Sequence, residues 1–191
     1  HYNIPNHCLL LYLSCRVVKP DKVVETGVYK GSSSAVTLQA LEDNNKGKLF
    51  SIDLPGTQQN PVIDSSSPYN SVKYNLSDEN DVGKKIPVDL EHRWELHLGR
   101  SDELLEPLLN DISPVDIFSH DSDHSYKNMM YEFKTARRYL SDSDLILSDD
   151  IDWNDSFEEF SNSYSENWIQ LTDIVNTNII ENDSMVGIAE L

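Results

Sequence analysis

The sequence predicts one α/β domain built on a doubly wound, mainly parallel sheet of seven strands, with helices on both faces and an antiparallel edge at the C-terminus. Short apolar segments alternate with amphipathic segments as far as residue 164, and two further strand-like segments close the chain. Parallel strands joined by helices form sheets that are covered on both faces. The length of 191 residues suits a single domain spanning 1–191, and no repeat or long linker divides it.

The expected elements follow from apolar periodicity and from the residues that start and stop helices. The N-terminal segment 1–20 contains the first helix and ends at Lys19-Pro20. Ser101 is the expected cap of the helix at 102–109. Residues 55–71 contain three prolines and are predicted to form a surface loop. Strands are expected at 23–26, 48–53, 95–98, 115–118, 145–147, 167–175 and 179–190. Helices are expected at 7–18, 32–41, 78–86, 102–109, 126–140 and 155–164.

The net charge argues against two classes of partner. The chain has 33 acidic and 15 basic residues, a formal net charge of −18. Nucleic acids and anionic membrane surfaces both require basic residues on the protein, so neither is an expected partner. No apolar run approaches the roughly 18 residues that span a bilayer. The charge suits metal ions and cationic cofactors instead.

The two cysteines indicate a reducing compartment. Cys8 and Cys15 are seven residues apart in an expected helix. This spacing separates their Cα atoms by about 10 Å, which is too far for a disulfide. They are predicted to be buried thiols of a cytoplasmic protein. A homo-oligomer is compatible with the sequence, which does not specify one.

A glycine turn follows the first expected strand. Residues 23–34 read VVETGVYKGSSS, so a strand carrying Glu25 turns through Gly27 to Gly31 and enters a serine-rich helix start. Gly27 lets the backbone turn tightly and approach a ligand closely. The next strand ends at Asp53, whose carboxylate can accept both hydroxyls of a ribose. The pattern predicts a nucleotide-like ligand beyond the carboxyl ends of the strands.

The acidity of this turn favours a cofactor that is cationic and lacks phosphate. The dinucleotide pattern G-x-G-x-x-G has glycine where this chain has Val28, and Glu25 would face the negative charge of a pyrophosphate. The chain also lacks the phosphate loop G-x-x-x-x-G-K-[ST]. S-adenosylmethionine fits better, because it carries a sulfonium and an α-ammonium group and no phosphate.

Carboxylates gather after the later strands. Asp121 and Asp123 follow one expected strand, and Asp149 and Asp150 end the next. Converging carboxylates repel one another unless a cation compensates, and Mg²⁺ prefers oxygen ligands of this kind. Neighbouring strand residues point to opposite faces, so Asp149 and Asp150 can share an ion only if the chain turns between them.

Three segments resemble motifs of one enzyme family. Residues 25–31 (ETGVYKG), followed by Asp53, resemble motifs I and II of the class I S-adenosylmethionine-dependent methyltransferases, which have a Rossmann-like fold. Residues 98–101 (LGRS) resemble the segment that lies near the adenine in that family. Residues 120–126 (HDSDHSY) are similar to the I-D-G-D-H-S-Y signature of the subgroup that includes the macrocin and aminocoumarin sugar O-methyltransferases. The resemblance covers about residues 7–160.

This resemblance implies a metal-assisted O-methyltransferase that acts on a hydroxyl of a sugar, glycan or small natural product. Asp123 would be the base that takes the acceptor's proton, with His124 as the alternative because its free pKa is closer to neutrality. Mg²⁺ would be held by Asp121, Asp149 and Asp150. The S-adenosylmethionine cofactor would be held by Glu25, Gly27, Tyr29, Gly31, Ser32, Asp53, Gly99, Ser101 and Asp121.

Other interpretations stay open. The enzyme could transfer methyl groups without a metal ion, with the acidic cluster orienting the acceptor. The domain could also bind the cofactor without catalysing a reaction. Asp123 or Ser125 could simply cap the helix that follows them.

A zinc hydrolase is a weaker alternative. His120 and His124 have a zinc-like spacing, and residues 119–124 (SHDSDH) resemble the H-x-H-x-D-H signature of metallo-β-lactamase-like hydrolases. Ser119 and Asp121 stand where that signature needs histidines, and the glycine turn would have no role in such an enzyme.

Overall fold

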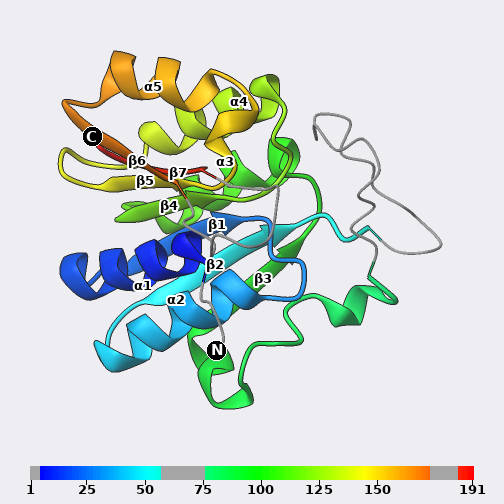
Figure 1. Ribbon diagram of the computed structural model, residues 1–191. Helices are drawn as coiled ribbons and strands as arrows, with labels where there is room; N and C mark the ends of the chain where they lie inside the picture. The colour runs from blue at the N-terminus through cyan, green and yellow to red at the C-terminus, as the bar shows by residue number, and fades with distance from the viewer. Residues whose placement is uncertain (1–4, 57–75, 173–184) are drawn as a thin grey trace, which may run out of the picture.

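The computed structural model, which describes residues 5–56, 76–172 and 185–191, has a sheet between two layers of helices (Figure 1). The strands are β1 (Lys22–Thr26), β2 (Lys48–Asp53), β3 (Trp94–Leu98), β4 (Ile117–His120), β5 (Leu145–Ser148), β6 (Asn167–Thr172) and β7 (Met185–Glu190). The helices are α1 (Asn6–Val18), α2 (Ser32–Asp43), α3 (Ser101–Ile112), α4 (Tyr126–Arg137) and α5 (Ser156–Tyr164), with short 3₁₀ turns η1 (Glu79–Asp81), η2 (Val88–Arg93) and η3 (Ile151–Trp153).

The sheet confirms the predicted fold class. Its seven strands have the order β3-β2-β1-β4-β5-β7-β6. The five strands from β3 to β5 are parallel, and β7 pairs antiparallel with both β5 and β6. The strand order reverses between β1 and β4, which is the position where ligands bind in open α/β sheets.

Alternating strand residues build one core on each face of the sheet. In β1, Val23 packs with α1 and α2, while its neighbour Val24 packs with α3, α4 and α5. Figure 1 shows α1 and α2 on one side of the sheet and α4 and α5 on the other. The same alternation recurs in β5, where Ile146 and Leu147 belong to opposite cores. Both faces are therefore buried, as the apolar strands predict.

Three local predictions are wrong. The expected helix at 78–86 is only the 3₁₀ turn η1, because Val82 takes an extended conformation and Gly83, at φ 73°, a left-handed one. Ser101 does not cap α3: its hydroxyl faces Asn128 instead, and Arg100 takes the cap position. Strand β4 begins and ends two residues later than expected, because the polar residues Ser119 and His120 are buried at its end, where His120 contacts the buried Glu132.

The two strands predicted at the C-terminal end of the chain are present as β6 and β7. Some predicted segments lie outside the described residues. This applies to most of the loop expected at 55–71 and to residues 173–184 between β6 and β7. Among the described helices, none is long and apolar enough to cross a membrane. Cys8 and Cys15 are buried and unbridged, as predicted.

Candidate active site

Hydrogen bonds beyond the strand ends bring three loops together at the carboxyl edge of the sheet. The amide of Gly27 donates to Ile52 O at 2.8 Å, and the amide of Asp121 donates to Thr26 O at 2.8 Å. The amide of Asp149 donates to the carbonyl of His120 at 3.1 Å. The ladder therefore continues past β1, β4 and β5, so the segments that follow these strands lie next to each other.

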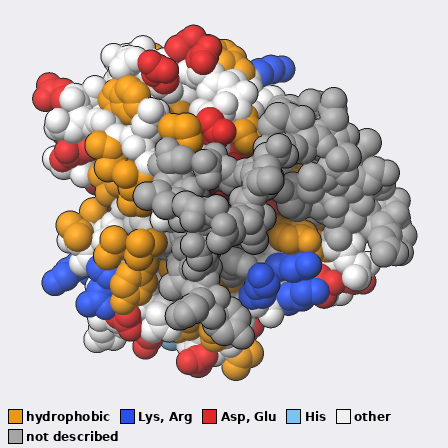
Figure 2. Space-filling model, in the orientation of Figure 1, with side chains coloured by type: hydrophobic (Ala, Val, Ile, Leu, Met, Phe, Trp, Pro, Cys, Tyr) orange, Lys and Arg blue, Asp and Glu red, His pale blue; other side chains and the backbone are white. Residues whose placement is uncertain are grey.

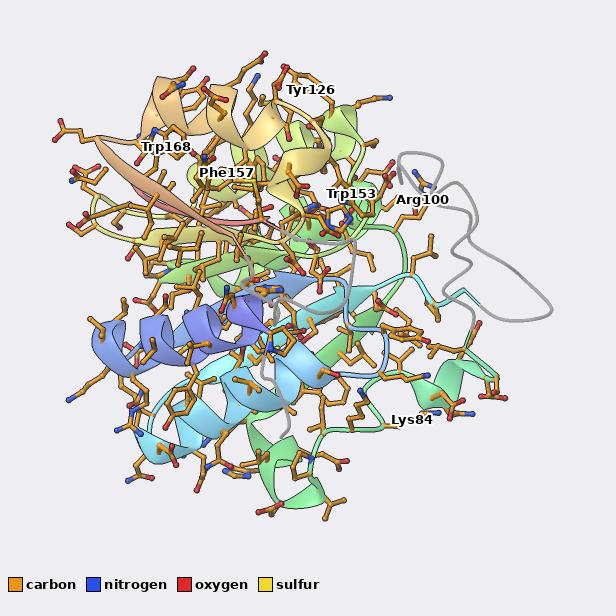
Figure 3. All side chains as sticks on the ribbon, in the orientation of Figure 1. Lys84, Arg100, Tyr126, Trp153, Phe157 and Trp168 are labelled. Carbon is orange, nitrogen blue, oxygen red and sulfur yellow. The ribbon has the colours of Figure 1, made fainter. Side chains whose placement is uncertain are left out.

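A pocket of about 500 Å³ opens at this edge. Its lining contains most of the residues predicted for the site, together with Trp153 and Arg100, which Figure 3 labels on the same side of the molecule. The predicted residues in the lining are Gly27, Tyr29, Asp53, Gly99, Ser101, Asp121, Asp123, His124, Asp149 and Asp150. A volume of this size is typical of small-molecule sites.

The glycine turn forms one wall of the pocket. Gly27 has φ 88°, and a Cβ atom added there would lie 1.8 Å from the carbonyl oxygen of Asp121. Only glycine therefore fits between the two loops. Asp53 Oδ1 accepts the amides of Val28 at 2.9 Å and Tyr29 at 3.3 Å, so the carboxylate at the end of β2 holds the turn in place.

Three predicted cofactor residues lie outside the pocket lining. Glu25 is buried, and its Oε1 accepts hydrogen bonds from the hydroxyls of Ser34 at 2.5 Å and Ser51 at 2.6 Å. Burial raises the pKa of Glu25 to about 7. Gly31 starts α2 in the left-handed conformation, and the hydroxyl of Ser32 accepts from Lys85 Nζ at 2.8 Å. Their cofactor roles stay predictions.

The acidic residues converge on the other side of the pocket. Asp121, Asp149 and Asp150 are each partly exposed, with side-chain exposures of 36%, 23% and 22%. Asp150 has φ 48°, a left-handed conformation that turns the chain and places both Asp149 and Asp150 in the lining. Burial and the charge of Asp149 raise the pKa of Asp121 well above its usual range.

A histidine that the sequence reasoning missed joins this cluster. His7, in the first turn of α1, is only 4% exposed. Its Nδ1 lies 3.1 Å from Asp149 Oδ2 and 4.0 Å from Asp121 Oδ2. Burial lowers the pKa of His7, but the two carboxylates outweigh burial and raise it to about 9. No acidic neighbour in the sequence signals this contact, which joins residues more than a hundred positions apart.

The two candidate bases are placed differently. Asp123 is exposed at the rim, where its Oδ1 accepts the amide of Ser125 at 2.9 Å. Ser125 caps α4 by accepting the amide of Asn128, as one of the open interpretations expected. His124 is 4% exposed, and its Nε2 lies 3.9 Å from Asp121 Oδ1 and 3.8 Å from Asp150 Oδ2.

A second missed residue organises the loop that carries these side chains. Glu132 of α4 is completely buried. Its Oε2 accepts from Thr26 Oγ1 at 2.5 Å and lies 2.7 Å from His120 Nδ1. Its Oε1 accepts from Ser122 at 2.8 Å and Asn128 at 3.0 Å. Because Glu132 engages His120, that ring is a partner of the core and not part of the pocket lining, which argues against the zinc interpretation.

Comparisons with known proteins agree with this geometry. A family model described as a methyltransferase domain matches residues 24–151. No curated protein matches the chain significantly.

Several solved structures share the fold at low sequence identity. An O-methyltransferase from Bacillus cereus, solved with S-adenosylhomocysteine, has a TM-score of 0.71 and 14% identity, covering 100% of this chain and 83% of that one. The O-methyltransferase TomG from Streptomyces achromogenes, solved with S-adenosylmethionine, has a TM-score of 0.68 and 16% identity, covering 100% and 81%. A methyltransferase from Geobacter sulfurreducens has a TM-score of 0.59 and 18% identity, covering 96% and 78%.

The family model covers well over half of the chain, from β1 through the acidic residues that follow β5. The segment it matches contains the glycine turn, Asp53 and the residues of the pocket's acidic side. The chain therefore belongs to the methyltransferase-domain family and is a class I S-adenosylmethionine-dependent methyltransferase.

Proposed function

We propose that the protein is an O-methyltransferase that transfers the methyl group of S-adenosylmethionine to a hydroxyl of a small molecule or glycan, assisted by a divalent cation. One observation carries the proposal. A single pocket is lined by the glycine turn and Asp53 on one side and by Asp121, Asp149 and Asp150 on the other. A cofactor and an acceptor can therefore be held side by side, as a displacement between two reactants requires.

The cofactor half of the pocket suits an adenosyl group with a positive charge. Gly27 lets the turn pack against the carbonyl of Asp121 at the pocket wall, and we propose that Asp53, which also lines the pocket, accepts the ribose hydroxyls. Gly99 and Ser101 line the pocket after β3, at the position proposed for the adenine. S-adenosylmethionine would supply a methyl group bonded to a positively charged sulfur. When the acceptor oxygen takes the methyl group, the electron pair of the broken C–S bond would stay on sulfur.

The acidic half fits a divalent cation by the chemistry of its donors. Asp121, Asp149 and Asp150 all line the pocket, and burial together with the charge of Asp149 raises the pKa of Asp121, so a cation between these carboxylates would stabilise their ionised forms. We propose that these carboxylates hold the ion, for which the sequence predicts Mg²⁺. A bound cation would supply positive charge beside the acceptor hydroxyl and so ease the loss of its proton.

We propose His124 as the base. Its imidazole lies at the pocket between Asp121 and Asp150 and packs against the Trp153 ring, with ring centroids 4.8 Å apart. Asp123 is exposed, and its carboxylate accepts a hydrogen bond from the amide of Ser125 at the start of α4, which suits a structural role.

Transfer of a labelled methyl group tests the proposed function. Purified protein and radiolabelled S-adenosylmethionine are incubated with a panel of hydroxylated sugars, glycans and phenols, with and without EDTA. The proposal expects label in at least one acceptor and loss of that transfer in EDTA. Unchanged transfer in EDTA would support the metal-independent alternative, and cofactor binding without any transfer would support a binding domain.

Substituting Gly27→Ala is expected to abolish cofactor binding. The new methyl group would overlap the carbonyl of Asp121, so the turn and the acidic loop would have to move apart. Titration calorimetry with S-adenosylhomocysteine measures the effect. The control is Gly187→Ala, whose Cβ would meet the Phe157 ring at 2.2 Å, away from the pocket lining. Both variants should lose stability, but only Gly27→Ala should lose binding. Equal binding by both would contradict the placement of the cofactor.

Substituting His124→Gln is expected to lower kcat about 100-fold, which is the lower end of the usual contribution of a general base. Asp123→Asn is expected to lower kcat less than about 10-fold, because a helix-start residue affects the rate only indirectly. Steady-state kinetics with a fixed acceptor measures both. The reverse order of effects would assign the base to Asp123.

A further inference from the structure

We propose that His7 is itself a ligand of the divalent cation, so that the site has mixed nitrogen and oxygen donors and prefers Mn²⁺ or Fe²⁺ over Mg²⁺. The inference rests on the metal-assisted function proposed above and specifies the ion. The three ligand atoms of His7, Asp121 and Asp149 all lie within 4.8 Å of one another. The family resemblance implies an all-carboxylate site, so His7 changes the chemistry that is expected there.

The two distances from the His7 ring nitrogen to the carboxylates fit one coordination shell. An ion about 2.1 Å from each ligand atom in an octahedral shell separates neighbouring ligand atoms by about 3.0 Å and opposite ones by about 4.2 Å. His7 Nδ1 lies 3.1 Å from Asp149 Oδ2 and 4.0 Å from Asp121 Oδ2. The first distance matches a pair of neighbouring ligands, and the second is close to an opposite pair.

The fold holds the ring of His7 in this orientation. α1 packs on the sheet through Leu11 and Cys15, both almost completely buried, and this packing fixes the start of the helix near β4. The second ring nitrogen, Nε2, lies 3.5 Å from the buried hydroxyl of Ser119. Histidines that bind metals commonly have such a partner on the other ring nitrogen, because it fixes the tautomer and the ring plane.

The donor set determines which ion is preferred. Mg²⁺ prefers oxygen ligands and keeps several waters, whereas imidazole suits first-row transition metals. Replacing one oxygen by an imidazole nitrogen therefore shifts selectivity toward those metals. Carboxylates remain in the majority, which suits the hard end of the series, Mn²⁺ and Fe²⁺.

A rival interpretation gives the opposite prediction for one variant. In that interpretation His7 is an imidazolium that neutralises Asp149 and Asp121 in place of an ion. Removing it would then free the carboxylates and strengthen the binding of any divalent cation. If His7 is a ligand, removing it weakens the binding of Mn²⁺.

Titration calorimetry with MnCl₂ and MgCl₂ separates these cases. For the wild type we expect Mn²⁺ to bind at least about 10-fold more tightly than Mg²⁺. His7→Gln is expected to lose about 10–100-fold in Mn²⁺ affinity and to change little for Mg²⁺. The matched control is His92→Gln, an exposed histidine that pairs with Glu42 at 3.3 Å and lies outside the pocket. Its metal affinities should equal those of the wild type.

A measurement on the wild type avoids dependence on the variant's folding. Pulsed electron paramagnetic resonance of bound Mn²⁺ should show coupling to one imidazole nitrogen. No such coupling, no Mn²⁺ binding, or unchanged or tighter binding in His7→Gln would overturn the proposal. Binding of S-adenosylhomocysteine is measured in parallel, so that failure of the ligand role is distinguished from failure of the proposed function.

Discussion

Substituting Asp121→Asn is expected to lower kcat by about 1,000-fold or more while raising the stability of the metal-free protein. Asp121 belongs to both proposed parts of the site, since it follows β4 beside the glycine turn and shares the pocket with Asp149. Loss of a metal ligand removes several kcal/mol of charge stabilisation, and each 1.36 kcal/mol corresponds to a factor of about ten in rate.

The gain in stability follows from the raised pKa of Asp121. Burial is the largest cause of the raised pKa, and the charges of Asp149 and Asp150 raise it further, although the charge of His7 lowers it. A carboxyl whose pKa is raised on folding binds its proton more tightly in the native state. Its ionisation therefore costs stability as the pH rises above the usual value near 3.9. Asparagine keeps the shape of the side chain and cannot ionise, so the variant avoids this cost at neutral pH.

Two measurements on Asp121→Asn check the expectation together. In EDTA at pH 7, its Tm should exceed that of the wild type, by about 2–4 °C for each kcal/mol of repulsion relieved. With Mn²⁺ or Mg²⁺ added, the order should reverse, because only the wild type gains stability from binding the ion. The control is Asp142→Asn, an exposed residue outside the pocket lining, which should change neither Tm nor rate. A lower Tm for Asp121→Asn in EDTA would contradict the repulsion.

Substituting Glu132→Gln is expected to destabilise the fold by about 3–5 kcal/mol, the usual cost of breaking a buried ion pair. Glu132 accepts from Thr26, Ser122 and Asn128 and pairs with His120 at 2.7 Å. An amide presents two hydrogens where these partners also donate, and it removes the carboxylate that lies 2.7 Å from Nδ1 of the buried His120. The substitution should therefore loosen β1, β4 and the loop that carries the proposed metal ligands.

The pH dependence of this loss can be derived from the pKa of Glu132. Burial opposes ionisation, but the charge and hydrogen bond of His120, with further hydrogen bonds, lower the pKa from 4.5 to about 2. A lowered carboxyl pKa contributes stability that is present above 4.5 and is lost as the pH falls toward 2. The wild type should lose this contribution on acidification, and Glu132→Gln should not show that part of the decline.

Urea denaturation at several pH values between 3 and 8 measures the free energy of unfolding for both proteins. The control is Glu106→Gln, which removes an exposed ion pair to Arg138 at 2.9 Å and should cost less than about 1 kcal/mol. If Glu132→Gln cost no more than Glu106→Gln at pH 7, the buried pair would not have the structural role assigned here.

The sequence predicted the sheet well, because alternating apolar strands and glycine turns are local signals. Residues 48–53 form a strand at the predicted bounds, and 32–41 and 126–140 differ from α2 and α4 only at their ends. The helix predicted at 78–86 does not form, because Val82 is extended and Gly83 is left-handed, which helical periodicity does not reveal. Ser101 was expected to cap α3, but its hydroxyl faces Asn128 across the fold.

The sequence predicted the pocket residues that directly follow strands, but it did not predict the residues that helices bring to the site. Asp121 and Asp149 meet because parallel neighbouring strands place their ends together. His7 and Glu132 reach the site from α1 and α4, and their roles depend on how those helices dock on the sheet. One buried histidine or glutamate in an amphipathic helix carries no signal of its partner in the sequence.

Figure 2 shows that apolar side chains also remain on the surface over α1. Leu9, Leu13 and Val17 are exposed there at 46%, 48% and 81%. They follow each other at four-residue spacing, on the side of the helix that faces away from His7 and Leu11, which are buried. The same helix therefore has one face that packs on the sheet and one that is open to solvent.

The most direct test is a crystal structure of the protein with S-adenosylhomocysteine and MnCl₂, with an anomalous difference map at the manganese edge. We expect the nucleoside to lie between the turn at Gly27 and Ser101. We expect one manganese peak about 2.2 Å from oxygens of Asp121 and Asp149. Nucleoside density outside this pocket, or manganese bound only elsewhere, would show that the two carboxylates do not place an ion beside the methyl donor.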